Sequence, residues 1–426
     1  MHTWKTIDRY MILSSDTHAG AAMREYKKYL DREWHDDFDA WADAVVNPWV
    51  DLRDPEKAKI NWDSDARVAA CDREGISGEV IFPNTLTPFY DILVHLSGVP
   101  RTAEEYARRR AGLRAHNRWL AEFCGFEPSR RRGLIQLLPN DIDDSIAELR
   151  WAKATGVIGG AMIPSIPPNH PVEPLYHPRY DPLWAECAAL EMPLHQHMGS
   201  GSPDLGDLPV AKGIVFAEHE MWPKRTLLHL VMGGVFERHA GLRVVWTEMW
   251  GMRWVLEELQ RIERRLQNVQ SRYANDPRVL NYSGTFGSET IDSLSLSPLE
   301  YWRRNCYIGA SMLPRADVEY RHAVGVDRIM WGDDFPHAEG ATGYLTDALR
   351  ATMYDVPVDE CRQMFAGVAA NVYGFDLETL TPLAARIGPV VAEVHTPLDH
   401  APLSRGEPFR DDPSLESLIT ASPAPI

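Results

Sequence analysis

Short apolar runs recur along the chain, and most are followed by a segment with the spacing of an amphipathic helix. Each run has the length of a buried strand, and several end at proline or glycine, which interrupt regular structure. The expected strands are 11–13, 79–82, 133–138, 160–163, 192–197, 242–246, 305–308 and 328–332. The clearest expected helices are 103–124, 141–153, 182–190, 224–238 and 254–273.

Eight strands that alternate with helices predict an α/β protein, a (β/α)8 TIM barrel, over residues 1–376. Two stretches that follow strands, about 20–62 and 199–223, are long for such connections. Because loops at the carboxyl ends of barrel strands usually build the site, we expect both to act as lid loops. The proline-rich residues 377–426 are expected to form a C-terminal tail that wraps the barrel or is partly disordered.

The composition narrows the class of function. The chain has 426 residues and a formal charge of −17, which argues against nucleic acid and anionic membrane surfaces as partners. Five scattered cysteines without a C-x-x-C pair, and no secretory or membrane-spanning segment, indicate a cytoplasmic protein. A small-molecule substrate is therefore expected.

Histidine and carboxylate side chains gather where the first and fifth strands end. Asp16 and His18 are two residues apart, as are His195 and His197. In an extended strand, positions i and i+2 point the same way, so each pair can face one metal ion. A loop aspartate and histidines with structural hydrogen bonds are the ordinary interpretations of these pairs.

The sixth and eighth strands end in carboxylates as well. Glu248 follows the sixth strand, and Asp334 follows the eighth, with His337 close behind it. A glutamate that begins a helix and an aspartate that caps a turn are the ordinary alternatives. A barrel brings all four strand ends around one mouth, so together they favour a metal site that lowers the pKa of a bound water.

These segments resemble a known family. The chain resembles the amidohydrolase superfamily, in the amidohydrolase-related branch that includes aminocarboxymuconate semialdehyde decarboxylase and γ-resorcylate decarboxylase. The resemblance runs in order over about residues 11–376. Its segments include Ser15-Asp16-Thr17-His18, Asn117–Phe123, Gly233–His239, Met330–His337 and Ala369–Asp376.

The resemblance implies a distorted barrel with one divalent metal ion at its mouth, held by Asp16, His18, His197 and Asp334. His197 rather than His195 takes the place of the family's fifth-strand histidine. Asp16 stands where many members have histidine, which makes the site harder, so zinc is expected first and manganese or iron next. Glu248 replaces the family's sixth-strand histidine, which puts a simple transfer of the decarboxylase mechanism in doubt.

We therefore expect a metal-dependent hydrolase that uses a metal-activated water on a small cyclic or aromatic carbonyl or carboxylate compound. The alternative is a non-oxidative decarboxylase of an aromatic or unsaturated acid, and a third interpretation is a metal-free binding protein. Asp334 or Glu248 would carry the proton.

The remaining expectations concern the substrate and the assembly. His195 and His337 would position substrate or stabilise an oxyanion. Arg253 and Arg315 would clamp a substrate carboxylate, with simple surface exposure as the alternative. A homodimer is expected.

Overall fold

The computed structural model describes residues 3–398, except 47–51, 53–54, 207, 273–287 and 312. Within these residues, eight parallel strands form one sheet in sequential order from β1 to β8. The strands are β1 Leu13–Ala19, β2 Gly78–Pro83, β3 Arg131–Gln136, β4 Ile158–Met162, β5 Leu194–His197, β6 Val244–Thr247, β7 Cys306–Ser311 and β8 Ile329–Gly332.

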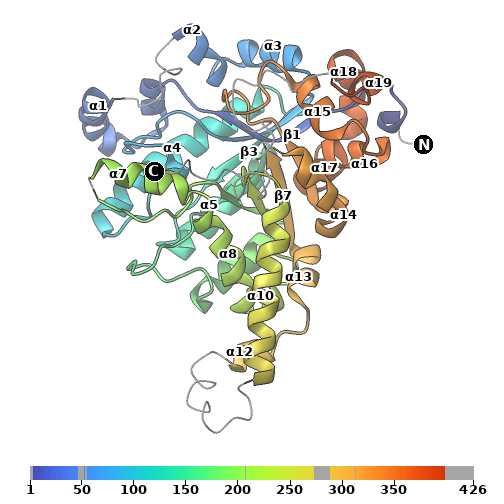
Figure 1. The fold of residues 1–426 in the computed structure, drawn as a ribbon. Coiled ribbons are helices and arrows are strands. Elements are labelled where there is room, and N and C mark those ends of the chain that lie inside the picture. The colour runs from blue at the N-terminus through green and yellow to red at the C-terminus, as the bar shows by residue number, and fades with distance from the viewer. Residues whose placement is uncertain are drawn as a thin grey trace, which may run out of the picture.

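The first and last strands meet and close the sheet. The backbone N–H of His18 donates to Phe335 O at 2.7 Å, and that of Asp334 donates to Asp16 O at 2.9 Å. The sheet is therefore a barrel with helices around it (Figure 1), and the predicted (β/α)8 TIM fold is confirmed.

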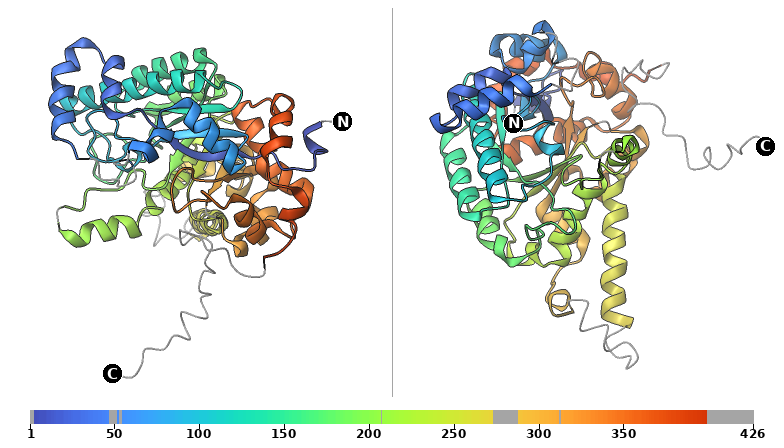
Figure 2. Two further views of the ribbon diagram at one scale, coloured as in Figure 1. Left: turned by 90° about the horizontal axis from the view of Figure 1, so that it is seen from above. Right: turned by 90° about the vertical axis from the view of Figure 1, so that its left-hand side faces the viewer.

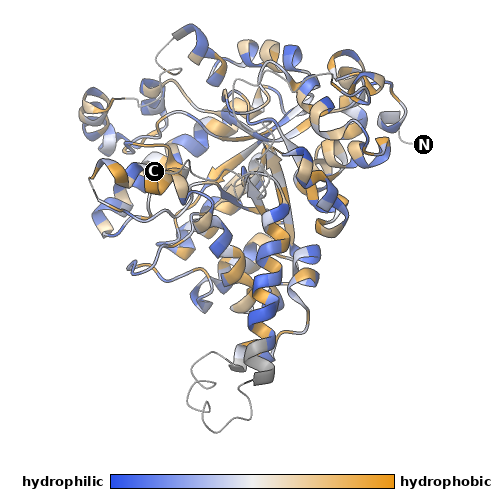
Figure 3. Ribbon diagram, viewed as in Figure 1, coloured by the Kyte–Doolittle hydropathy of each residue, from blue (hydrophilic) through white to orange (hydrophobic). Residues whose placement is uncertain are grey.

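Helices surround the barrel on all sides in the further views (Figure 2). They turn apolar side chains toward the strands, and the strands at the centre are themselves largely hydrophobic (Figure 3). Asp141 caps the start of α5 by accepting a hydrogen bond from the Asp144 N–H. The principal helices are α3 Ser64–Glu74, α4 Ala103–Gly125, α5 Ile142–Thr155, α6 Asp181–Ala189, α8 Met221–Met232, α10 Arg253–Arg272, α13 Pro298–Asn305, α15 Leu345–Met353 and α17 Val368–Tyr373. No helix among the described residues is both long and apolar enough to cross a membrane.

Three elements differ from the sequence expectations. Strand β1 extends to Ala19 rather than ending at residue 13, because its polar side chains are buried inside the barrel and broke the apolar pattern. The helix expected over 224–238 is two helices, α8 and α9 (Val235–Arg238), separated where Gly234 takes a φ of +67°. Residues 199–223 are not all loop, since they contain the helix α7 (Pro209–Ala217).

The segment after β1 and the C-terminal region contain short helices. Between β1 and α3 lie η2 Met23–Tyr29, η3 Arg32–Trp34, α1 His35–Ala44, α2 Pro55–Ala58 and η5 Lys59–Asn61. The expected tail begins with two helices, α18 Leu377–Ile387 and α19 Val391–Val394. The Tyr10 N–H donates to Pro389 O at 2.8 Å, so this part packs on the N-terminal segment. Residues 399–426 lie outside the described part, and the lid and tail functions stay predictions.

Candidate metal centre

Strand β1 points two ligand-type side chains to the same side. Asp16 and His18 are fully buried, and His18 Nε2 lies 3.2 Å from Asp16 Oδ1. His18 Nδ1 lies 3.2 Å from Pro83 O, a carbonyl that can only accept a hydrogen bond. The hydrogen of the neutral ring is thus placed on Nδ1, which leaves Nε2 with its lone pair directed at the cluster, as in metal-binding histidines.

Strands β5 and β6 supply the next two side chains. His197 Nε2 lies 3.0 Å from Glu248 Oε2 and 3.8 Å from Asp16 Oδ1. His197 Nδ1 lies 3.1 Å from Met198 O, so the same argument leaves its Nε2 toward the cluster. Glu248 has a φ of +59°, a conformation that few residues without special constraint adopt and that is concentrated at functional sites.

These side chains form a compact set of metal-ligand atoms. One candidate atom from each of Asp16, His18, His197 and Glu248 lies within 4.8 Å of the others, and His18, Asp334 and His337 form a second such group. Within the described part of the chain, Asp16 Oδ1 and Asp334 Oδ2 are buried and accept no hydrogen bond. Carboxylate oxygens and imidazole nitrogens that converge in this way fit a divalent metal ion.

The charges of the cluster push its pKa values apart. Burial raises the pKa of Glu248 well above its usual value, and the carboxylates of Asp334 and Asp16 raise it further. Burial opposes the ionised form of Asp16 too, but the neighbouring imidazoles of His18 and His197 hold its pKa below the usual range. Burial likewise opposes the charged form of His18, yet Asp16 and Asp334 hold its pKa well above the usual value. The carboxylates of Asp16, Glu248 and Asp334 lie close together in this buried site, so a bound cation would relieve their repulsion.

Asp334 enters the cluster from the end of β8, where its backbone has a φ of +54°. Its Oδ1 lies 3.1 Å from His18 Nε2 and 2.8 Å from His337 Nδ1, and the two imidazole rings stack at 4.1 Å. The neighbouring Asp333 instead accepts a hydrogen bond from Trp331 Nε1 at 2.7 Å, and burial raises its pKa to about 7. Of the two adjacent aspartates, Asp334 is therefore the one that reaches the cluster.

Two further strand ends contribute residues that the sequence analysis did not single out. Ser311, at the end of β7, donates to Asp16 Oδ2 at 2.5 Å. Asn84, directly after β2, has its Oδ1 3.0 Å from His337 Nε2. Both occupy the strand-end position that marks the other site residues. Neither side chain is ionisable, so a pattern of histidines and carboxylates at strand ends does not indicate them.

Three other predicted site residues lie apart from the ligand atoms. His195 is inside the barrel, stacked on Tyr373 with ring centroids 5.6 Å apart, and burial lowers its pKa to about 3. Arg253 is exposed and pairs with Glu257, whereas Arg315 pairs with Asp355 at 2.7 Å. Both guanidinium groups thus face carboxylates outside the cluster. The roles assigned to these residues stay predictions.

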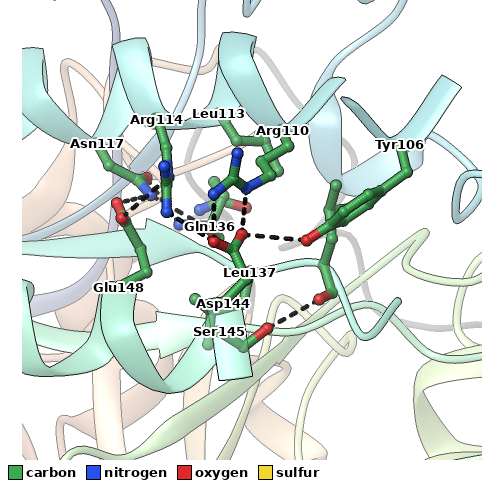
Figure 4. Close-up of a pocket in the computed structure, with 11 residues that line it drawn as sticks. Tyr106, Arg110, Leu113, Arg114, Asn117, Gln136, Leu137, Asp144, Ser145 and Glu148 are labelled. Carbon is green, nitrogen blue, oxygen red and sulfur yellow. Dashed lines mark hydrogen bonds and ion pairs between the residues drawn. The ribbon is translucent and has the colours of Figure 1, made fainter. Parts of the chain in front are cut away.

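A pocket between α4 and α5 contains carboxylates that, unlike those of the metal cluster, are paired with arginines (Figure 4). Arg110 and Arg114 both bind the Asp144 carboxylate, and Arg118 holds both oxygens of Glu148. Each carboxylate has a guanidinium partner, so this network needs no metal to balance its charge.

Comparison with known proteins gives the family. Residues 90–375 match the model of the amidohydrolase family. The chain belongs to the amidohydrolase family. It is an enzyme of that family, and the resemblance predicted from the strand-end segments is confirmed.

Among curated proteins, the chain is similar to γ-resorcylate decarboxylase of Rhodococcus jostii (strain RHA1), with 30% identity over 205 residues. The match covers 43% of this chain and 61% of that relative. The chain thus aligns with less than two thirds of the relative's length.

Solved structures share the fold at low sequence identity. An amidohydrolase from Mycobacterium avium subsp. paratuberculosis K-10 has a TM-score of 0.62 at 19% identity, over 86% of this chain and 98% of that one. The 5-carboxyvanillate decarboxylase of Novosphingobium aromaticivorans DSM 12444, complexed with manganese and a nitrobenzoic acid, has a TM-score of 0.60 at 17% identity. That comparison covers 86% of this chain and 97% of the other.

Proposed function

We propose that the protein is a metal-dependent, non-oxidative decarboxylase of a hydroxylated aromatic acid. The observation that carries the proposal is the sequence match to γ-resorcylate decarboxylase together with a buried cluster of carboxylates and imidazoles at the barrel mouth. The comparisons favour this alternative over the hydrolase that the sequence analysis put first. The reason is that the relatives with named activities are decarboxylases.

In this proposal Asp16, His18 and His197 hold the metal ion, with Glu248 beside them. When bound, the metal would supply a positive charge that attracts an anionic substrate and withdraws electron density from it. The donor set combines carboxylate oxygens with imidazole nitrogens, so it fits manganese as well as the zinc expected from the sequence, and we choose manganese. Manganese in the structures of decarboxylases with this fold supports the same choice.

Loss of carbon dioxide leaves a ring carbon that must gain a proton, and we assign the delivery of that proton to Asp334. Its Oδ1 is held between His18 and His337, while its buried Oδ2 accepts no hydrogen bond from the described residues. Oδ2 is therefore the oxygen that can carry a proton to substrate.

Carbon dioxide release by the manganese-loaded full chain tests the proposal. We expect release from 2,6-dihydroxybenzoate or a related 2-hydroxybenzoate, and a loss of at least about 100-fold in the Asp334→Asn variant. Asp327→Asn, at an exposed surface pair with Arg328, serves as the matched control and keeps full activity. Hydrolysis of esters or amides without carbon dioxide release from any hydroxybenzoate would overturn the decarboxylase assignment.

A further inference from the structure

His337 stands between the metal cluster and a row of two buried asparagines. Its Nδ1 faces Asp334 Oδ1 at 2.8 Å, and its Nε2 faces Asn84 Oδ1 at 3.0 Å. Asn84 Nδ2 in turn donates to Asn61 Oδ1 at 2.6 Å, and Asn61 Nδ2 donates to Ala58 O at 2.9 Å. Both amides are buried, with 1% and 2% of their surface exposed for Asn61 and Asn84.

The direction of every hydrogen bond in this row follows from its far end. Ala58 O can only accept, so the amide nitrogen of Asn61 must face it. Asn61 Oδ1 is then turned toward Asn84 and takes a hydrogen from Asn84 Nδ2, which leaves Asn84 Oδ1 toward the imidazole. An oxygen acceptor at 3.0 Å requires a hydrogen on His337 Nε2.

The backbone holds both asparagines in place. The Asn84 N–H donates to Ala19 O at 2.9 Å, and Asn61 O accepts from the Gly20 N–H at 3.2 Å. The row is thus anchored at the end of β1, next to the strand that bears Asp16 and His18. Its amides have little freedom to turn over.

We propose that Asn61 and Asn84 are positioning residues that hold a hydrogen on Nε2 of His337, while its Nδ1 faces Asp334. Without them, the ring could instead place its hydrogen on Nδ1 and donate it to the carboxylate. A carboxamide neither gains nor loses a proton near neutral pH. The row therefore does not conduct protons away from His337.

The catalytic consequence rests on the proposed function, but the state of the ring does not. Nitrogen-15 NMR of histidine-labelled full chain, with and without zinc, reads the hydrogen on each ring nitrogen directly. The His337 signals are those that vanish in His337→Gln. We expect a protonated Nε2 in the native protein. A His337 ring with hydrogen on Nδ1 and none on Nε2 would overturn the proposal.

Variants of Asn84 separate positioning from a general effect on folding. Asn84→Leu removes the acceptor, and we expect hydrogen to move toward Nδ1. Asn84→Asp keeps an oxygen in place, so the native signature is retained. Asn371→Leu, at an exposed position on α17, is the matched control and leaves the His337 signals unchanged. An unchanged signature in Asn84→Leu would show that the row does not set the ring.

Turnover supplies the second measurement. If Asn84 acts through His337, Asn84→Leu lowers kcat more than it raises KM, and adding it to His337→Gln causes no further loss. Independent, multiplying losses would overturn the positioning role. Absence of carbon dioxide release from the native enzyme would count against the proposed function alone, because the NMR result stands without substrate.

Discussion

Two buried charged clusters occupy opposite ends of the barrel strands, and they balance their charges in different ways. At the start of β2, Glu79 accepts hydrogen bonds from Arg67 Nη2 at 2.7 Å and Arg131 Nε at 3.2 Å, with all three side chains almost fully buried. Burial acts to raise the pKa of Glu79, but the two guanidinium groups hold it below the usual value.

In the described part of the chain, no arginine forms an ion pair with the carboxylates of the cluster at the other end. Burial raises the pKa of Glu248, and neighbouring carboxylates raise it further rather than lowering it. Burial alone therefore does not mark a functional carboxylate. A carboxylate with a complete set of cationic partners is structural, whereas one that lacks them in a buried site is a candidate for a bound metal.

A substitution of Glu79 tests the contrast between the two clusters most directly. Replacing it with Gln leaves Arg67 and Arg131 buried without their counter-charge, so we expect a loss of about 3–5 kcal/mol in the free energy of unfolding. Urea unfolding measures the loss. Glu186→Gln, which cuts a pair with the exposed Arg150, is the control and costs less than about 1 kcal/mol. Equal effects of the two changes would contradict the structural role of Glu79.

His116 is a buried histidine that, among the described residues, has no carboxylate partner, unlike His18. Burial lowers the pKa of His116 to about 3, so its neutral form is favoured in the folded protein. Its contribution to stability is complete above the unfolded value of 6.5 and falls by about 1.4 kcal/mol per pH unit as the pH drops from there toward 3. Unfolding profiles of the native protein and His116→Gln should differ by this slope. Parallel profiles would refute it.

Glu248 should respond in the opposite sense to Glu79. Its folded pKa lies above the unfolded value of 4.5, so in metal-free protein its stabilising contribution is present below pH 4.5 and is lost as the pH rises. Glu248→Gln removes that loss, and we expect the metal-free variant to be more stable than the native protein at neutral pH. The same change should weaken manganese binding about 10-fold or more. A less stable metal-free variant would contradict the destabilising effect of the Glu248 charge.

Much of this site could be predicted because polar residues at strand ends are conspicuous in sequence. The (β/α)8 order follows from apolar runs alone, and it places Asp16, His197, Glu248 and Asp334 at one mouth. The end of β1 was predicted too early, because a strand whose polar side chains face a buried site lacks the apolar pattern.

Other features depend on contacts that sequence spacing does not contain. Asn84 is visible in the sequence as the end of a strand, but its partners Asn61 and His337 are set by long-range packing. The pairing of Arg315 with Asp355 likewise depends on how α15 docks. The sequence alone favours hydrolysis, because Glu248 replaces the sixth-strand histidine of the family's decarboxylases. The similarity to γ-resorcylate decarboxylase favours decarboxylation instead.

The smallest expected effect is at Ser311, which donates one hydrogen bond to Asp16 Oδ2. Ser311→Ala should cost about 1 kcal/mol of stability. Because the serine orients a proposed ligand, the variant should also weaken metal binding by about 10-fold. Isothermal titration with manganese checks this, and native affinity in the variant would show that Ser311 does not orient Asp16.

We propose that the buried carboxylates and imidazoles at the barrel mouth hold a cation, and metal stoichiometry tests this most directly. After incubation with manganese and removal of excess ion, elemental analysis should find about one metal ion per native chain. Asp16→Asn and His197→Gln should each retain less than about a tenth of it, while Asp327→Asn retains all. Folded native protein that binds no divalent metal, or variants that keep the full content, would contradict the account.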